Sequence, residues 1–230
     1  MGRTFAVSDL HGCLNLWKQI EKFLEPDDKI YVLGDCGDRG PEPWETIKAV
    51  AANPQAIYIK GNHEDMLYHA LVDWTRHGVL SDDYWLLVHN GGENTFEGWM
   101  RDGEKEGWIK YLKDLPKYAT YTNTQGFDIF MTHAGFNPNK LMSTYSILWG
   151  RSHFSTPWTG LNNQIVVHGH TPVQYLAQEL GLEEELEPGA LWYCDNHKIC
   201  LDCGSFDSNY TTVLDLDTFD EHIFMIEGEK

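Results

Sequence analysis

The stretch Thr4-Phe5-Ala6-Val7-Ser8-Asp9-Leu10-His11-Gly12 decides the fold of this chain. It begins as a short apolar run, which is typical of a buried strand, and it ends in polar residues beside a glycine. Apolar residues with helical spacing follow at Leu14, Trp17, Ile20 and Leu24. A buried strand that leads into a helix predicts crossover connections and a partly parallel sheet.

The same pattern occurs twice more in the first third of the chain. Residues 30–33 and 56–59 are predicted strands, and residues 44–52 and 64–77 have helical spacing. Each of these strands is followed by a short motif of glycine with Asp, His or Asn. Because open α/β sheets bind ligands at the carboxyl ends of their strands, we expect these motifs to meet in space.

The rest of the chain predicts more helices and a second sheet within a single domain, residues 1–230. Residues 81–116 are rich in Trp, Gly and charge, which favours helices and loops in which Trp85, Trp99 and Trp108 pack. The last three of the remaining strands are expected to form an antiparallel meander that completes the second sheet. The predicted strands are 128–132, 164–167, 198–201, 211–216 and 222–226.

The chain is strongly acidic, with Lys+Arg 17 against Asp+Glu 35 and a net charge of -18. Such a surface repels nucleic acid and anionic lipid, so we expect neither as a partner. No run approaches the roughly 18 apolar residues that cross a bilayer, and no signal peptide is recognisable, so we expect a cytoplasmic protein. A phosphate site here needs its own positive field, and bound metal ions are the strongest local source.

The five cysteines do not predict a disulfide framework, because they are an odd number in a chain without an export signal. Cys194, Cys200 and Cys203 could form a structural zinc site. However, no second Cys-x-x-Cys pair accompanies them, so buried or half-buried thiols are favoured. The acidic run at residues 183–187 favours a solvated loop face.

The strand-end motifs contain the residue types that bind transition-metal cations. Asp9 and His11 lie two residues apart, so both side chains point to one side if the chain is still extended there. Taken singly, each residue is better explained by a turn or a surface hydrogen bond. Five strand ends that all carry Asp, His or Asn beside glycine favour a metal site instead. The other candidate donors are Asp35, Asn62, His133 and His170, and such mixed oxygen and nitrogen donors suit Mn, Fe, Zn or Ni.

These motifs resemble those of the calcineurin-like metallophosphoesterases, and within them the phosphoprotein phosphatase branch with its bacteriophage and bacterial members. The resemblance spans Asp9 to about Gly204. Two departures are mild: Cys36-Gly37 replaces an aliphatic pair, and His168 precedes the motif that carries His170. We interpret His168 as a residue that packs behind the ligands. The matching motifs are Asp9-Leu10-His11-Gly12, Gly34-Asp35-Cys36-Gly37-Asp38-Arg39-Gly40, Gly61-Asn62-His63-Glu64, Asn90-Gly91-Gly92, His133-Ala134-Gly135, Trp149-Gly150-Arg151 and Gly169-His170-Thr171-Pro172.

The resemblance implies a fold and a metal centre. The expected fold is α/β (α+β by some schemes), with two mixed β-sheets packed face to face and helices on the outside. The centre would hold two divalent cations, with Mn first among the candidates and Fe, Zn or Ni as alternatives. A hydroxide shared by the cations would attack phosphorus in line. Asp9 and His11 would hold the first cation, Asp35 would bridge, and Asn62, His133 and His170 would complete the second.

The resemblance also implies roles for residues that do not bind metal. His63 would be the general acid for the leaving group, held in its protonated form by Asp38. The competing interpretation makes His63 a structural residue at a helix start. Arg39 and Arg151 would bind the phosphoryl oxygens. Glu64 would cap the helix that begins there rather than bind metal.

The leading hypothesis is a metal-dependent serine/threonine-type protein phosphatase that also acts on small phosphomonoesters. The enzymatic alternative is a symmetrical bis(5'-nucleosyl)-tetraphosphate hydrolase, whose members usually carry a longer insertion and Gly-Asn-His-Asp in the third motif. The shorter chain and Glu64 favour the phosphatase. A non-catalytic interaction module is disfavoured, because every expected position is filled. The sequence leaves the oligomeric state and the native metals open.

Overall fold

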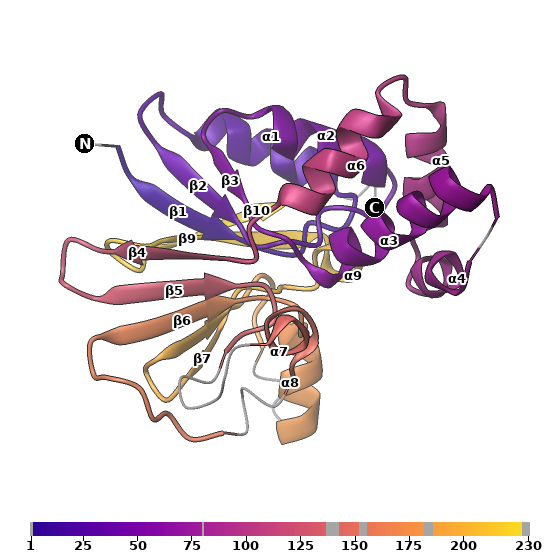
Figure 1. Cartoon of the computed structure of the whole chain (residues 1–230). Coiled ribbons are helices and arrows are strands. Elements are labelled where there is room, and N and C mark those ends of the chain that lie inside the picture. Colours follow the sequence, from indigo (N-terminus) through magenta and orange to yellow (C-terminus); the bar gives the residue numbers. More distant parts are fainter. Residues whose placement is uncertain (1, 80, 137–142, 152–155, 182–185, 227–230) are drawn as a thin grey trace.

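The computed structural model describes residues 2–79, 81–136, 143–151, 156–181 and 186–226 (Figure 1). Two five-stranded sheets lie one above the other in this view, with helices gathered outside the upper sheet and at one end of the strands of the lower one. Among the helices within these ranges, none combines the length and the apolar character that a membrane crossing requires.

The first sheet has the strand order β10-β9-β1-β2-β3. Its parallel part consists of β1 (Thr4–Val7), β2 (Lys29–Val32) and β3 (Ala56–Tyr58), with Thr4 opposite Lys29 and Ile30 opposite Ala56. Its antiparallel part adds β9 (Tyr210–Asp215), which pairs with β1, and β10 (Glu221–Met225) at the edge. The parallel part confirms the prediction made from the first third of the sequence.

The second sheet has the strand order β4-β5-β6-β8-β7. Its strands are β4 (Tyr118–Thr122), β5 (Asp128–Thr132), β6 (Gln164–His168), β7 (Trp192–Cys194) and β8 (Lys198–Cys200). Strands β5, β6 and β8 are parallel, while β4 and β7 pair antiparallel at the two edges. Both sheets are therefore mixed, as expected.

Helices pack outside the first sheet, some on its outer face and others against those helices, and they extend the apolar packing there. They are α1 (Leu14–Phe23), α2 (Pro43–Ala52), α3 (Asn62–His77), α4 (Asp82–His89), α5 (Glu93–Arg101) and α6 (Lys105–Asp114). Buried side chains of β1 and β2 pack there against apolar residues of α1, α2 and α3. The shorter helices α7 (Thr144–Trp149), α8 (Val173–Leu180) and α9 (Ser205–Ser208) follow later in the chain.

A second apolar core lies between the two sheets. Ala6 and Leu214 from the first sheet share it with Met131, Val167 and Ile199 from the second. Because one set of buried side chains comes from both sheets, the sheets pack face to face. The predicted α/β sandwich is confirmed.

The predicted C-terminal meander is confirmed only in part: β9 and β10 pair antiparallel, but they do not belong to the second sheet. Strands β7 and β8 do complete the second sheet, but β9 and β10 return to the first, where Phe5 pairs with Asp215 and Ala6 with Leu214. Residues 211–215 of β9 are buried throughout, as suits a strand with a neighbour on each side and a core against it. The apolar run predicted a strand correctly, but it holds no information about which sheet the strand joins.

Other predictions have mixed outcomes. Trp99 is buried and Trp108 packs against the core, but Trp85 is 58% exposed, so the prediction that it packs is wrong. The thiols of Cys200 and Cys203 are buried and that of Cys194 is half-buried, as expected. Most of the acidic run lies outside the described residues, apart from half-buried Leu186 and exposed Glu187.

Candidate metal centre

The predicted donors converge at the carboxyl ends of five strands from both sheets. Asp9 follows β1, Asp35 follows β2 and Asn62 begins α3 just after β3. From the second sheet, His133 follows β5 and His170 follows β6. All five side chains are buried, and they lie where strand ends of the two sheets meet.

Asp35 lies at the centre of this cluster. Its Oδ2 is 3.2 Å from Nε2 of His133, 3.7 Å from Nε2 of His63 and 3.8 Å from Nε2 of His11. Nε2 of His133 also lies 2.8 Å from Oδ1 of Asn62. The backbone N–H of His63 donates to Oδ1 of Asp35 at 3.0 Å. The arrangement is that of a carboxylate shared between two groups of donors.

Two groups of potential ligand atoms share Asp35. One comprises His11, Asp35 and His63, and the other comprises Asp35, His133 and His170; within each group the ligand atoms lie within 4.8 Å of one another. Asp9 is adjacent, because its Oδ2 accepts the backbone N–H of His170 at 3.0 Å and the hydroxyl of Ser8. Donors separated by up to 161 residues in sequence are therefore brought together.

The backbone around the cluster is held in a left-handed conformation that residues other than glycine rarely adopt. Six of the predicted site residues have positive φ values, between 39° and 70°. Such strain of non-glycine residues clusters at functional sites, where the surrounding structure maintains it. The residues are Asp9, His11, Asp35, Asp38, Arg39 and His170.

Two glycines make room for the carboxylates. A Cβ on Gly169 would lie 2.0 Å from Oδ2 of Asp9, and a Cβ on Gly61 would lie 2.1 Å from Oδ1 of Asp35. No side chain fits at such distances, so the glycines in these motifs are required by the close approach of backbone to carboxylate.

The donor set fits divalent cations. Two buried ligand-type atoms, Oδ1 of Asp9 and Nε2 of His170, lack a hydrogen-bond partner among the described residues, a cost that coordination of a cation would remove. Burial raises the pKa of Asp9 to about 6, opposed by the charge of His133 and reinforced by that of Asp35. Burial, followed by the charge of His133, lowers the pKa of His170 to about 2, so this imidazole is neutral and able to bind metal. Buried carboxylates beside neutral imidazoles are the chemistry of a mixed oxygen and nitrogen metal site.

His63 and Asp38 form a close pair beside the cluster. Nδ1 of His63 lies 2.5 Å from Oδ2 of Asp38, and both side chains are buried. Burial acts to lower the pKa of His63, but the charge of Asp35 and the hydrogen bond to Asp38 outweigh it and raise the pKa above its ordinary value. The protonated imidazole is thereby favoured, which is the state that a proton donor needs.

The two arginines lie near different members of the cluster. Arg39 places Nη1 3.0 Å from Nε2 of His11 and Nη2 3.2 Å from Nε2 of His63. Arg151 is exposed and reaches Oγ1 of Thr171 at 3.4 Å, directly after His170 in the chain. Both guanidinium groups are thus near predicted ligands, Arg39 in closer contact than Arg151.

Glu64 does not face the donor cluster. Its Oε2 accepts the backbone N–H groups of Asp35 and Gly61, each at 2.8 Å. Its Oε1 accepts the N–H of Cys36 at 2.9 Å and the hydroxyl of Tyr58 at 2.7 Å. The predicted capping role is confirmed, and the same carboxylate also ties the end of β2 to the start of α3.

Replacing Glu64 with glutamine is expected to destabilise the fold, because all four partners are donors and the new amide NH₂ would oppose two of them. We expect a loss of about 2–4 kcal/mol in the free energy of unfolding. Urea denaturation measures it, with Glu45→Gln as the control, since Glu45 is exposed and, among the described residues, forms an ion pair only with Lys48 at 2.7 Å. Equal midpoints for the two variants would contradict this account of Glu64.

The sequence interpretation missed two residues that support the site. Tyr58 is a strand residue that donates to Glu64, and Thr95 on α5 exchanges hydrogen bonds with Asp38. The nearest signal in the sequence was the Asn90-Gly91-Gly92 motif that precedes Thr95. His168 is fully buried in β6 beside Gly169, and burial lowers its pKa to about 4, in agreement with the predicted packing role.

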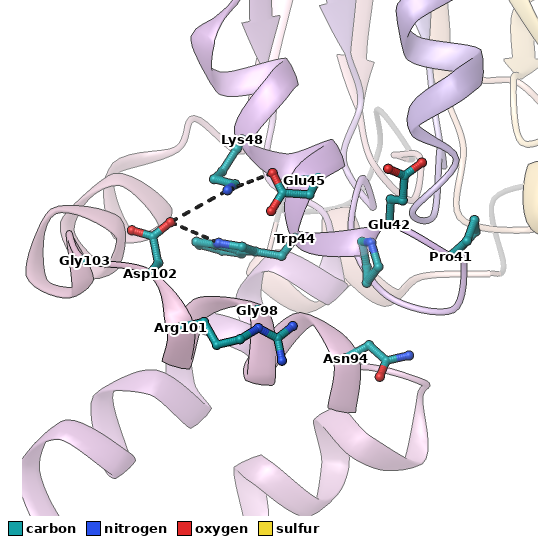
Figure 2. Close-up of a pocket in the computed structure, with 11 residues that line it drawn as sticks. Pro41, Glu42, Trp44, Glu45, Lys48, Asn94, Gly98, Arg101, Asp102 and Gly103 are labelled. Carbon is teal, nitrogen blue, oxygen red and sulfur yellow. Dashed lines mark hydrogen bonds and ion pairs between the residues drawn. The ribbon is translucent and has the colours of Figure 1, made fainter.

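A separate cavity of about 610 Å³ lies between the start of α2 and α5 (Figure 2). Three of its charged groups are paired with one another: Lys48 lies between Glu45 and Asp102, and Trp44 donates to Asp102 at 3.2 Å. Within the described part of the chain, no predicted site residue lines it. This cavity is therefore separate from the strand-end cluster.

Comparison with known proteins agrees with this geometry. The model of the calcineurin-like phosphoesterase family matches residues 2–174. The asymmetrical bis(5'-nucleosyl)-tetraphosphatase PrpE of Anoxybacillus flavithermus is 25% identical over 204 residues, covering 73% of this chain and 78% of that protein. A symmetrical bis(5'-nucleosyl)-tetraphosphatase of Aliivibrio fischeri is 28% identical over 146 residues, covering 61% of this chain but only 48% of that protein.

A similar fold is seen in the crystal structure of a proposed diadenosine tetraphosphatase. It has a TM-score of 0.66 at 15% sequence identity and covers 97% of this chain and 93% of that one. At this identity the likeness supports the fold alone. Since the family model covers most of the chain and takes in the strand-end cluster, the chain belongs to the calcineurin-like phosphoesterases, which are hydrolases that act on phosphate esters.

Proposed function

We propose that the chain is a metal-dependent phosphomonoester hydrolase, best suited to esters with a poor leaving group such as phosphoserine and phosphothreonine in proteins. The observation that carries this proposal is the buried His63–Asp38 pair, with its 2.5 Å contact, next to the donor cluster. A serine or threonine alkoxide leaves only when it is protonated, so a held proton donor matters most for such substrates.

Two divalent cations would be held by the six predicted donors, with Mn first among the candidates and Fe, Zn or Ni as alternatives. When bound, such a pair supplies Lewis acidity and an activated water for in-line displacement. The contact between Arg39 and Nε2 of His11 has to give way when His11 binds a cation. The proposed ligands are Asp9, His11, Asp35, Asn62, His133 and His170.

The other predicted residues would act on the phosphoryl and leaving groups. His63 would donate a proton to the leaving oxygen while Asp38 holds Nδ1 and keeps the ring oriented. Arg39 and Arg151 would bind phosphoryl oxygens, since a guanidinium offers paired N–H donors in the geometry that phosphate accepts. The free thiols fit a reducing compartment, and we propose a cytoplasmic location for a single catalytic domain.

The second candidate is a bis(5'-nucleosyl)-tetraphosphate hydrolase, favoured by the names of the relatives. Glu64 does not separate the two candidates, because its carboxylate accepts backbone N–H groups and does not face the donor cluster. The two candidate functions differ in whether the leaving group needs a proton. A nucleotide phosphate leaves without protonation, so this reaction would depend far less on His63.

The test is chelation followed by re-addition of Mn, Ni, Mg, Zn or Ca, assayed with a phosphoserine peptide and diadenosine tetraphosphate in parallel. We expect chelation to abolish hydrolysis, and Mn to restore it most strongly and chiefly on the phosphopeptide. Restored activity on the dinucleotide alone would replace the first candidate with the second. Activity that survives complete metal removal would contradict both.

A further inference from the structure

Thr95 on α5 is bonded twice to Asp38, the partner of His63. The hydroxyl of Thr95 donates to Oδ1 of Asp38 and accepts the backbone N–H of the same residue at 3.0 Å. Its side chain is fully buried. One hydroxyl thus fixes both the backbone and the carboxylate of Asp38, leaving Oδ2 directed at His63.

The segment before Thr95 holds the neighbouring residue as well. The backbone N–H of Arg39 donates to the carbonyl oxygen of Gly91 at 3.0 Å. Asp38 and Arg39 both have left-handed backbone conformations, with φ values of 65° and 62°. Such a conformation persists only where surrounding contacts maintain it, and here α5 and the loop before it supply these contacts.

We infer that Thr95 is a positioning residue for proton donation, acting through Asp38 on the ring of His63. The inference rests on the proposed function, because it assigns a task to the proposed proton donor. It also gives α5, which supplies none of the predicted ligands, a part in the chemistry. Without the hydroxyl, Oδ1 and the N–H of Asp38 lose this partner, and the carboxylate can turn away from Nδ1 of His63.

Leaving-group dependence tests the inference. The variants are Thr95→Val, which keeps the shape and removes the hydroxyl, and Thr95→Ser, which keeps the hydroxyl. With Mn present, we expect Thr95→Val to lower kcat about 10-fold or more on phenyl phosphate and a phosphoserine peptide, whose leaving groups need a proton. On p-nitrophenyl phosphate, whose leaving group needs none, the loss should stay within about 2-fold. Thr95→Ser should keep the rates on all three esters near wild type.

Thr46→Val is the matched control. Thr46 is equally buried, on the neighbouring helix α2, and its hydroxyl donates to the carbonyl of Glu42 at 2.7 Å. This variant should lose stability without any difference between the two leaving groups. Thermal unfolding of every variant identifies loss of folded protein. If Thr95→Val does not fold, Thr95→Ala, which also removes the hydroxyl but places no methyl group against Asp38, is compared with Thr46→Val instead.

The possible outcomes distinguish a failure of the proposed function from a failure of the positioning role of Thr95. A wild-type protein that hydrolyses none of the three esters with any metal overturns the proposed function. A wild-type protein that is active, with Thr95→Val losing the same factor on both leaving groups, overturns the positioning role of Thr95 alone. A wild-type ratio of rates in Thr95→Ser together with a changed ratio in Thr95→Val supports that role.

Discussion

Asp35→Asn is expected to lower kcat on the order of 10³-fold or more with Mn and a phosphoserine peptide, the scale of losing a preorganised electrostatic group. The reason is the central place of Asp35, whose Oδ2 lies within 3.8 Å of ring nitrogens of His11, His63 and His133. An amide keeps the shape but removes the negative charge and one acceptor oxygen. Isothermal titration with Mn should show fewer bound cations per chain than in the wild type.

Asp28→Asn is the control for this change. Asp28 is a buried carboxylate just before β2, whereas Asp35 follows the same strand, so the two lie at opposite ends of it. Asp28 is paired with Arg3 at 2.6 Å, and its replacement should reduce stability and leave metal binding unchanged. If Asp35→Asn bound two cations as the wild type does, Asp35 would not be a bridging ligand.

The candidate cluster could be predicted because every member lies next to the end of a strand. Asp9, Asp35 and His133 are placed by β1, β2 and β5, and parallel strands bring their carboxyl ends to one edge. The apolar runs located these strands within a residue or two. The two departures noted in the motifs, Cys36 and His168, are both buried and leave the cluster intact.

What the sequence could not predict depends on packing between distant segments. Thr95 contacts Asp38 across 57 residues, and nothing in the local pattern of α5 distinguishes this threonine from one that faces the core. The sheet that β9 joins could not be predicted either, because an apolar strand fits both sheets and only the packing of the assembled core selects one. Trp85 was assigned to packing on composition alone, yet it is largely exposed on α4.

His63→Asn is expected to lower kcat about 10²–10⁴-fold on the phosphoserine peptide and far less on p-nitrophenyl phosphate, since general acid catalysis contributes most to a poor leaving group. The pKa of His63 is raised above its ordinary value, so the imidazolium is present below that pKa and is lost as pH rises through it. The pH–rate profile of the wild type on the peptide should therefore have a descending limb, on which the rate falls as pH rises through the pKa of His63. In His63→Asn the limb should be absent.

The control is His69→Asn, on the same helix α3, where the exposed ring of His69 lies 3.8 Å from Asp65. It should retain the wild-type rate and the wild-type pH profile. A phosphopeptide rate in His63→Asn that kept the descending limb would assign the proton to another group, and the close contact with Asp38 would then have only a structural role. A large loss on the peptide with little loss on diadenosine tetraphosphate would instead show that one cluster serves both substrates and that only the ester with the poor leaving group requires the acid.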